Sequence, residues 1–441
     1  MPRHRTHPPL QVLINNRPVG RLIKQPSGAI SFRYDRSWLD WQHAFAISLS
    51  LPLRETAYSG VPVTAVFENL LPDNPGVRKK VAERTGAEGA DYYSLLERIG
   101  RDCVGAMQFL PEGTEIDALP DVEGEPIDEG GIEAMLANLA SAPLGIDLDG
   151  EFRISVAGAQ EKTALLFHDG RWMRPLGTTP TTHILKPQLG DIPTAFGIID
   201  MQHSVDNEHY CLRLLSAFGL AVATTHIETF GKRRVLVVER FDRQWRGNRI
   251  LRLPQEDCCQ ALSIPPARKY QSTGGPGAAD ILKLLRGADE PLGDQAAFFK
   301  SQLIFWLIGA TDGHGKNFSI FLRPGGRFGL TPLYDVLSAQ GAFDLKQVPN
   351  NKYKLAMSVG ASRKYRILEI SGRHFIETAR EAGLGAATIK AILQQIIEVG
   401  SGAAFTALAE MPDDFHPAIH ESVAKAIDAR LPRIETALAS L

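Results

Sequence analysis

Residues 296–322 read AAFFKSQLIFWLIGATDGHGKNFSIFL, and this stretch decides which fold the sequence predicts. Its first part, residues 296–309, is apolar nearly all round, which is typical of a helix buried in a core. A polar segment rich in glycine follows, and residues 318–322 are again apolar and predict a strand. We therefore expect a short polar loop that is held at one end by a core helix and at the other by a core strand.

This loop carries Asp312 and Asn317 in the spacing Asp-x-x-x-x-Asn. In the catalytic loop of protein kinases an aspartate and an asparagine have this spacing. There the aspartate accepts the proton of the substrate hydroxyl, and the asparagine binds a magnesium ion. The structural alternative is an ordinary turn at the end of a helix, in which both side chains only cap the backbone.

A second acidic residue, Asp335, follows an apolar segment that predicts the return strand of a hairpin. The turn of this hairpin is Arg-Pro-Gly-Gly-Arg at residues 323–327. A hairpin would bring Asp335 back beside Asn317, and an aspartate with an asparagine offers the oxygen ligands that Mg²⁺ prefers. The alternative is a loop aspartate that only forms hydrogen bonds to the backbone.

The preceding part of the chain is rich in predicted strands. Lys186 ends one of them, and a lysine in that position requires a counter-charge if it is buried, which a nucleotide phosphate would supply. Glu208, on the next predicted helix, is the candidate partner of this lysine. Residues 155–163 could present backbone N–H groups to phosphate, and residues 237–242 could line an adenine. The alternatives are a solvated lysine, an ordinary turn and a strand end with surface charges.

Composition limits the classes of function. The chain has 441 residues, 44% of them hydrophobic and 22% charged, so we expect a folded globular protein. A net charge of −2 excludes nucleic-acid binding through bulk charge. Cys103, Cys211, Cys258 and Cys259 fit no zinc or disulfide spacing. With neither a signal peptide nor a membrane span in the sequence, we expect a cytoplasmic protein without a membrane partner.

Four regions follow from the composition and the predicted elements. Residues 1–115 are predicted to form a small mixed α/β subdomain, and residues 116–150, which are acidic and rich in Gly and Pro, a linker. Residues 151–240 are predicted to form a β-rich nucleotide-binding lobe, and residues 241–441 a helical catalytic lobe.

The order of these features resembles the HipA family of bacterial toxin kinases. The stretches that carry the resemblance include FRISVAGAQEKTALL at 152–166, VERFDR at 238–243, LIGATDGH at 307–314 and LTPLYD at 330–335. The resemblance covers nearly the whole chain. It implies an α+β, two-lobed protein-kinase-like fold with a small N-terminal α/β subdomain, a β-rich nucleotide lobe and an all-helical C-terminal lobe. It assigns no role to residues 343–354.

The resemblance also implies a serine/threonine protein kinase that uses ATP and Mg²⁺. Asp312 would be the catalytic base, Asn317 and Asp335 would hold the metal, and Ser155 would be the site of inactivating autophosphorylation. The residues that would contact the nucleotide are Ala157, Gly158, Ala159, Gln160, Glu161, Lys162, Lys186, Glu239, Arg240, Phe241, His314, Gly315, Lys316, Asn317, Tyr334 and Asp335.

The expected partner is a HipB-like helix-turn-helix antitoxin, through which operator DNA would be bound. Members of this family phosphorylate glutamyl-tRNA synthetase, which makes that enzyme the expected protein substrate, with growth arrest and persistence as the outcome. Two alternatives stay open at this point. One is a non-catalytic co-repressor within an antitoxin–DNA complex, and the other is a kinase that acts on a small molecule or lipid.

Overall fold

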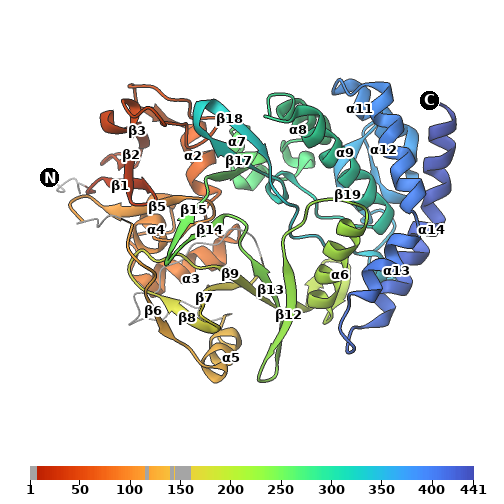
Figure 1. Ribbon diagram of the computed structural model, residues 1–441, viewed down its shortest axis with the longest axis horizontal. Helices are drawn as coiled ribbons and strands as arrows, with labels where there is room; N and C mark the ends of the chain where they lie inside the picture. The colour runs from red at the N-terminus through yellow and green to blue at the C-terminus, as the bar shows by residue number, and fades with distance from the viewer. Residues whose placement is uncertain (1–6, 115–118, 140–143, 145–159) are drawn as a thin grey trace. The chain divides into compact units, whose positions relative to one another are not determined.

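The computed structural model describes residues 7–114, 119–139, 144 and 160–441. The chain divides into two compact units, each built from three stretches. The first unit contains Met1–Pro187, Glu228–Ala267 and Ile320–Arg327, and the second contains Gln188–Ile227, Arg268–Ser319 and Phe328–Leu441. Figure 1 draws the chain as a ribbon and labels many of its helices and strands.

The N-terminal part of the first unit is an antiparallel sheet of order β4-β3-β2-β1-β5 with helices beside it. Phe32 and Phe109 both pack on Phe67, with ring centroids 5.4 and 5.7 Å apart, which joins the sheet to α2 through buried aromatic rings. The elements are β1 (Leu10–Ile14), β2 (Arg17–Lys24), β3 (Ile30–Tyr34), α1 (Arg36–Leu39), β4 (Tyr58–Ser59), α2 (Val61–Glu68), α3 (Pro75–Thr85), α4 (Tyr92–Ile99) and β5 (Met107–Pro111).

A second sheet of the first unit has the order β12-β13-β9-β7-β8-β6 (Figure 1). Its strands are β6 (Gly124–Pro126), β7 (Thr163–His168), β8 (Arg171–Pro175), β9 (His183–Pro187), β12 (Thr225–Phe230) and β13 (Arg233–Glu239). β13 is an apolar run that pairs with β9 in antiparallel register, Leu236 opposite Lys186. The strands predicted near residues 163, 183 and 235 are confirmed, whereas the strand expected at residues 152–156 lies outside the described residues.

The predicted linker at residues 116–150 is wrong for its central part. β6 and α5 (Glu129–Ala137) lie there, β6 pairs with β8, and Ile132, Met135 and Leu136 of α5 are buried. The acidic composition concealed a short amphipathic helix, whose apolar side packs near β13.

The rest of the first unit contains β14 (Arg243–Arg246), β15 (Arg249–Arg252), β16 (Gln255–Asp257), α7 (Cys258–Ala261) and η2 (Pro266–Arg268). Near these strands lies a fully buried group of Asp102, Asp242, Arg240, Arg243 and Arg252, here called the arginine–aspartate cluster. Arg240 contacts both carboxylates, at 3.2 Å from Asp102 and 2.9 Å from Asp242. Burial raises the pKa of Asp102, but Arg243, Arg240 and Arg252 outweigh burial and hold that pKa below its usual value.

Glu256 in β16 gives the first unit an expected pH dependence. Burial raises the pKa of Glu256 to about 8, although the Leu49 N–H donates to its carboxyl group at 2.8 Å. The folded chain then holds a proton at neutral pH that the unfolded chain releases near the ordinary value of 4.5. Because the folded state binds more protons, the free energy of unfolding falls as the pH rises from about 4.5 to about 8.

We expect Glu256→Gln to remove this part of the pH dependence, since the amide keeps the shape and an acceptor but does not titrate. Urea unfolding of both proteins between pH 5 and pH 8 measures it, and the difference between their free energies should change by up to about 1.4 kcal/mol per pH unit. Parallel curves for the two proteins would contradict the protonated state of Glu256.

The second unit is built around α9 (Pro291–Ile308), whose side chains are buried from Phe298 to Ile308. It is in contact with α8, α11, α12 and α14 (Figure 1). The helices of this unit are α6 (Ser204–Ala217), α8 (Ala278–Leu285), α9, α10 (Gln340–Asp344), α11 (Gly372–Glu381), α12 (Ala386–Val399), α13 (Gly402–Ala409) and α14 (Pro417–Ala439), with 3-10 turns η3 (Gln271–Thr273), η4 (Gly315–Asn317) and η6 (Ile367–Glu369).

The expectation of a purely helical C-terminal lobe needs correction. Hairpins of short strands lie in it, because turn-forming residues break the helical pattern. They are β19 (Lys354–Val359) with β20 (Lys364–Arg366), and β17 (Ser319–Arg323) with β18 (Arg327–Leu330) around the turn η5 (Pro324–Gly326). A further hairpin of the second unit joins β10 (Gly190–Thr194) and β11 (Gly197–Met201). The α+β class is confirmed.

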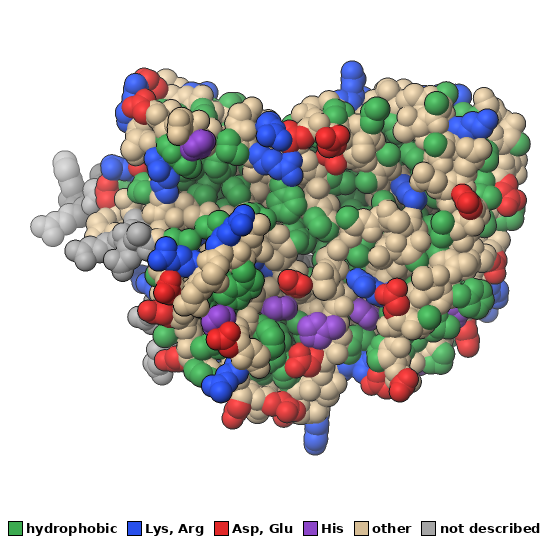
Figure 2. All heavy atoms as spheres, in the orientation of Figure 1, with side chains coloured by type: hydrophobic (Ala, Val, Ile, Leu, Met, Phe, Trp, Pro, Cys, Tyr) green, Lys and Arg blue, Asp and Glu red, His purple; other side chains and the backbone are tan. Residues whose placement is uncertain are grey.

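The charges on the surface, the lengths of the helices and the state of the cysteines can be compared with what the composition predicts. Acidic and basic side chains are interspersed over the face drawn in Figure 2. In the described part of the chain no single helix has the length and apolar composition to cross a membrane, while α12 and α13 meet these criteria only jointly across a 60° bend. The four cysteines are free and buried.

Candidate active site

The end of α9 fixes where the Asp312 loop begins. Gly309 has a φ of 72°, the left-handed conformation that stops a helix, and a Cβ there would lie 2.0 Å from the Tyr353 hydroxyl oxygen. Arg430 donates to the carbonyls of Trp306 at 3.0 Å and Leu307 at 2.7 Å. The last carbonyls of α9 are thereby satisfied by a cation, which the helix dipole favours.

Backbone hydrogen bonds hold the loop itself. The His314 N–H donates to the Asp312 carbonyl at 2.7 Å, and the Asn317 N–H donates to the His314 carbonyl at 2.9 Å. The Tyr334 hydroxyl donates to the Lys316 carbonyl at 2.8 Å. Gly315 and Lys316, both predicted to contact the nucleotide, are buried in η4. The loop is therefore a fixed turn.

The Asp312 side chain is 65% exposed, and its carboxylate is oriented by an aromatic neighbour. The Tyr270 hydroxyl donates to it at 2.6 Å, and His314 Nε2 lies 4.0 Å from its other oxygen. The rings of Tyr270 and His314 meet edge to face, with centroids 4.9 Å apart. Sequence reasoning missed Tyr270, because it lies 42 positions away and belongs to no motif.

Asn317 and Asp335 lie together, as the hairpin predicts. The side-chain amide of Asn317, which is buried, donates to the Asp335 carbonyl at 3.1 Å. Asp335 has a φ of 59°, an uncommon conformation for a residue other than glycine and one often found at functional sites. The Thr331 N–H donates to the Ser319 carbonyl at 2.9 Å, which sets the register of the returning strand.

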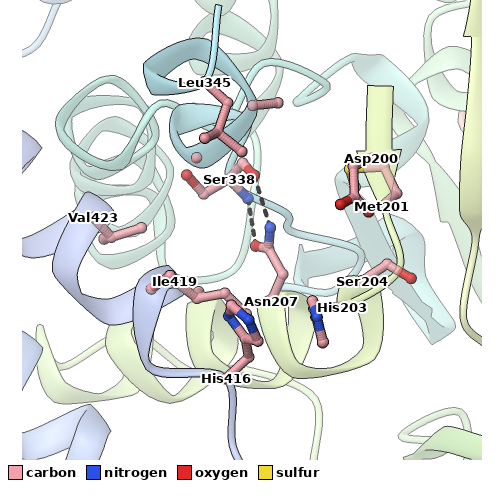
Figure 3. Close-up of a pocket in the computed structure, with 13 residues that line it drawn as sticks. Asp200, Met201, His203, Ser204, Asn207, Ser338, Leu345, His416, Ile419 and Val423 are labelled. Carbon is pink, nitrogen blue, oxygen red and sulfur yellow. Dashed lines mark hydrogen bonds between the residues drawn. The ribbon is translucent and has the colours of Figure 1, made fainter. Parts of the chain in front are cut away.

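The segment that follows Asp335 is tied to two helices of the same unit. The side-chain amide of Asn207, in α6, donates to the Ser338 carbonyl at 2.8 Å. The Ser338 N–H in turn donates to the side-chain oxygen of Asn207 at 2.9 Å (Figure 3). The Ser338 hydroxyl also donates to the Ile308 carbonyl at the end of α9, at 2.6 Å. Glu208, the predicted lysine partner, is the next residue of α6 and is buried. The sequence did not indicate Asn207 or Ser338 as residues that hold this segment.

In the first unit, two buried lysines lie at one end of adjacent strands. Thr163 of β7 is opposite Leu185 of β9, so the same antiparallel register places Lys162 next to Lys186. Both lysines are buried, and the Gln160 side chain donates to the Pro187 carbonyl at 3.2 Å. This register puts both lysines at the position where the sequence predicted contacts with nucleotide phosphates.

Residues 239–241 differ in how they are placed. Glu239 is exposed at the end of β13, and Phe241 packs edge to face on Phe321, with centroids 5.8 Å apart. The Arg240 guanidinium is buried in the arginine–aspartate cluster and donates to the Cys103 carbonyl at 2.8 Å. The side chain of Arg240 thus has a structural task, which leaves its backbone as the part that could contact a nucleotide.

The structure describes only part of the turn that was predicted to bind phosphate. Glu161 is exposed, and Gln160 is half-buried. Ser155, Ala157, Gly158 and Ala159 lie outside the described residues. Within the residues that are described, no three His, Cys, Asp or Glu side chains form a metal-binding group. Asn317 and Asp335 supply an amide and a carboxylate, which suits Mg²⁺ because this ion usually keeps waters and phosphate oxygens as its other ligands.

The arrangement defines an α+β protein with a kinase-like fold, and comparisons with known proteins agree. HipA in its complex with HipB and operator DNA, from Shewanella oneidensis MR-1, aligns with a TM-score of 0.79 at 24% identity. The alignment covers 98% of this chain and 99% of that chain. This likeness confirms the kinase-like fold class that the sequence predicted.

The model of the HipA-like C-terminal domain matches residues 154–402, more than half of the chain, and that of the HipA N-terminal domain matches residues 10–110. The chain belongs to the HipA family. It is 35% identical to the provisionally named kinase Y4mE of Sinorhizobium fredii over 92% of this chain and 93% of the relative. It is 31% identical to the serine/threonine-protein kinase toxin HipA of Shewanella oneidensis over 73% of this chain and 72% of the relative.

Proposed function

We propose that the chain is an ATP- and Mg²⁺-dependent serine/threonine protein kinase and the toxin of a toxin–antitoxin pair. The observation that carries the proposal is the arrangement within the second unit. One fixed loop presents the exposed carboxylate of Asp312 and, at its other end, Asn317 in contact with Asp335. The kinase names of the two relatives support the class of reaction.

The residues divide the chemistry between them. The acceptor hydroxyl forms a new bond to the γ-phosphorus of ATP while the bond from that phosphorus to the β,γ-bridging oxygen breaks, and ADP leaves. Asp312 accepts the hydroxyl proton, and the Tyr270 hydrogen bond holds its carboxylate in one orientation. Lys162 and Lys186 are assigned to the phosphates on the basis of their shared burial and strand register.

Asn317 and Asp335 would hold Mg²⁺, which neutralises phosphate charge as the transition state forms. The left-handed backbone of Asp335 fits this assignment, because backbone strain of this kind is kept at sites where a side chain must have one direction. Ser338 and Asn207 keep the segment in place from both sides.

The partner and the substrate belong to the same proposal. The solved relative is a complex of HipA, HipB and operator DNA, which supports a HipB-like antitoxin through which this chain reaches DNA. The proposed protein substrate is glutamyl-tRNA synthetase. Phosphorylation of Ser155 is proposed to inactivate the kinase, because phosphate adds a charge of about −2 to a turn that would otherwise bind phosphate. The region boundaries drawn at residues 115, 150 and 240 stay predictions.

The test is transfer of labelled phosphate from ATP by the purified full-length chain with Mg²⁺, first to itself and then to purified glutamyl-tRNA synthetase. Label in the synthetase supports the whole proposal. Label in other bacterial proteins but not in the synthetase would keep the kinase and overturn its substrate. The absence of label from every protein, with a correctly folded chain, would favour the co-repressor alternative.

A further inference from the structure

A small pocket of the second unit is lined by residues of α10, η6 and α14. Its volume is about 200 Å³. One side is apolar and includes Phe343, Ile367 and Leu368. The ring of Phe343 stacks on Tyr353 with centroids 4.2 Å apart, and Leu368 is 46% exposed. Pockets for drug-sized ligands have volumes of about 300–1,000 Å³, so this pocket has room for a smaller molecule only.

The other side of the pocket carries an excess of positive charge. Lys425, Arg430 and Arg433, all of α14, line it together with one carboxylate, that of Asp344. The Asp344 carboxylate accepts a hydrogen bond from the side-chain amide of Gln340 at 2.8 Å. Within the described part of the chain, none of the three cations is in an ion pair. A further anion would therefore be attracted to this side of the pocket.

Arg430 is the buried member of the three cations, with 7% of its surface exposed. Its Nη1 donates to the carbonyls of Trp306 and Leu307 at 3.0 and 2.7 Å. Its Nη2 donates to Gln340 Oε1 at 2.6 Å and to the Tyr353 hydroxyl at 3.1 Å. All four acceptors are neutral. A buried guanidinium without a carboxylate partner is costly, and an anion in the pocket would reduce that cost.

We propose that this pocket binds a small organic carboxylate. The carboxylate would pair with the cations of α14, because guanidinium groups match a carboxylate in both charge and shape. The apolar part of the molecule would pack on Phe343, Ile367 and Leu368. An organic anion is favoured over inorganic phosphate, because phosphate has no apolar part to cover these side chains. Inorganic phosphate is the competing ligand of the test.

The pocket is connected to the candidate catalytic loop through one side chain. Arg430 lines the pocket and also donates to the last carbonyls of α9, which precede Gly309 and the Asp312 loop. An anion bound to Arg430 offsets the positive charge that stabilises this end of the helix. We therefore expect a bound carboxylate to lower the rate of phosphoryl transfer. This effect rests on the proposed kinase function, whereas the binding itself does not.

The binding experiment compares benzoate with benzamide, which have nearly the same size and shape and differ in charge. Ligand-observed NMR titrations of the full-length chain give the Kd of each. We expect benzoate to bind at least about tenfold more tightly than benzamide, and inorganic phosphate to bind more weakly than benzoate. The proposal would be overturned by equal binding of benzoate and benzamide, by no binding of benzoate, or by phosphate binding as tight as that of benzoate.

Variants locate the binding. Lys425→Glu reverses one charge of the pocket, and Ala429→Leu fills part of it without changing any charge. Each should weaken benzoate binding by about tenfold or more. The matched control is Lys390→Glu, which makes the same charge change at an exposed position of α12 outside the pocket. Equal weakening in Lys390→Glu and Lys425→Glu, or unchanged binding in Ala429→Leu, would contradict a site in this pocket.

Transfer of labelled phosphate measures the connection to the loop. With saturating ATP and Mg²⁺, benzoate should lower the rate in the unchanged chain and in Lys390→Glu but not in Ala429→Leu. An unchanged rate in the unchanged chain, or an equal fall in all three proteins, would overturn the connection through Arg430. Binding of benzoate by a chain that transfers no label under any condition would contradict the kinase function and still support the carboxylate site.

Discussion

Asp312→Asn is expected to lower the rate of phosphoryl transfer by about 10²- to 10⁴-fold, the range over which a general base contributes. The asparagine keeps an oxygen that can accept the Tyr270 hydrogen bond, so the loop geometry should be preserved. What it loses is the ability to take the acceptor proton. The measurement is label transfer to the protein substrate under saturating ATP and Mg²⁺, together with the unfolding midpoint of each protein.

The matched control is Asp413→Asn, an exposed aspartate of the second unit outside the candidate site. It should transfer phosphate like the unchanged chain. Full activity in Asp312→Asn would remove Asp312 from its assigned role. A fall in activity together with a lower unfolding midpoint would mean that Asp312 has a structural role rather than a catalytic one.

Asp102→Asn is expected to destabilise the first unit by about 3–5 kcal/mol, the cost of breaking a buried ion pair from one side. Asp102 contacts Arg240 at 3.2 Å, Arg243 at 2.9 Å and Arg252 at 3.1 Å, and all of these side chains are buried. Removing its charge leaves three guanidinium groups with Asp242 as the remaining carboxylate of the cluster. Chemical denaturation, followed by the signal of the first unit, measures the change.

Asp121→Asn provides the comparison, since it breaks a pair with Arg249 at the surface, where both side chains are more than half exposed. No measurable loss of stability is expected there, because exposed pairs contribute little. If Asp102→Asn unfolds at the same denaturant concentration as Asp121→Asn, the cluster does not carry the stability assigned to it.

Local patterns predicted many of the elements and the chain order of the candidate site. The apolar run at residues 296–309 became α9, and the hairpin with its turn at residues 323–327 brought Asp335 to Asn317. These predictions succeeded because a helix, a tight turn and a strand are specified by neighbouring residues. The linker prediction failed because α5 is short and begins with an acidic residue and two glycines, and its apolar residues are buried by contacts with a distant strand.

The supporting residues could not be predicted in the same way. Tyr270 lies 42 positions before Asp312, to which it donates a hydrogen bond. Asn207 lies 131 positions before Ser338, with which it is hydrogen-bonded. Nothing local marks such a residue, because its role exists only once the helices have packed. Arg240 illustrates the opposite case, in which a residue within a matching motif has its side chain buried in an ion cluster.

The assignment of Asn317 and Asp335 to a magnesium site is tested by a calorimetric titration of ATP into the full-length chain, with Mg²⁺ and with the metal chelated. Asp335→Asn is the variant to compare, because asparagine also tolerates the left-handed backbone at this position. We expect ATP affinity that depends on Mg²⁺, and at least about a tenfold loss of that dependence in the variant. ATP binding that is the same with and without Mg²⁺, or a variant that keeps the full metal dependence, would show that Asn317 and Asp335 do not hold the metal.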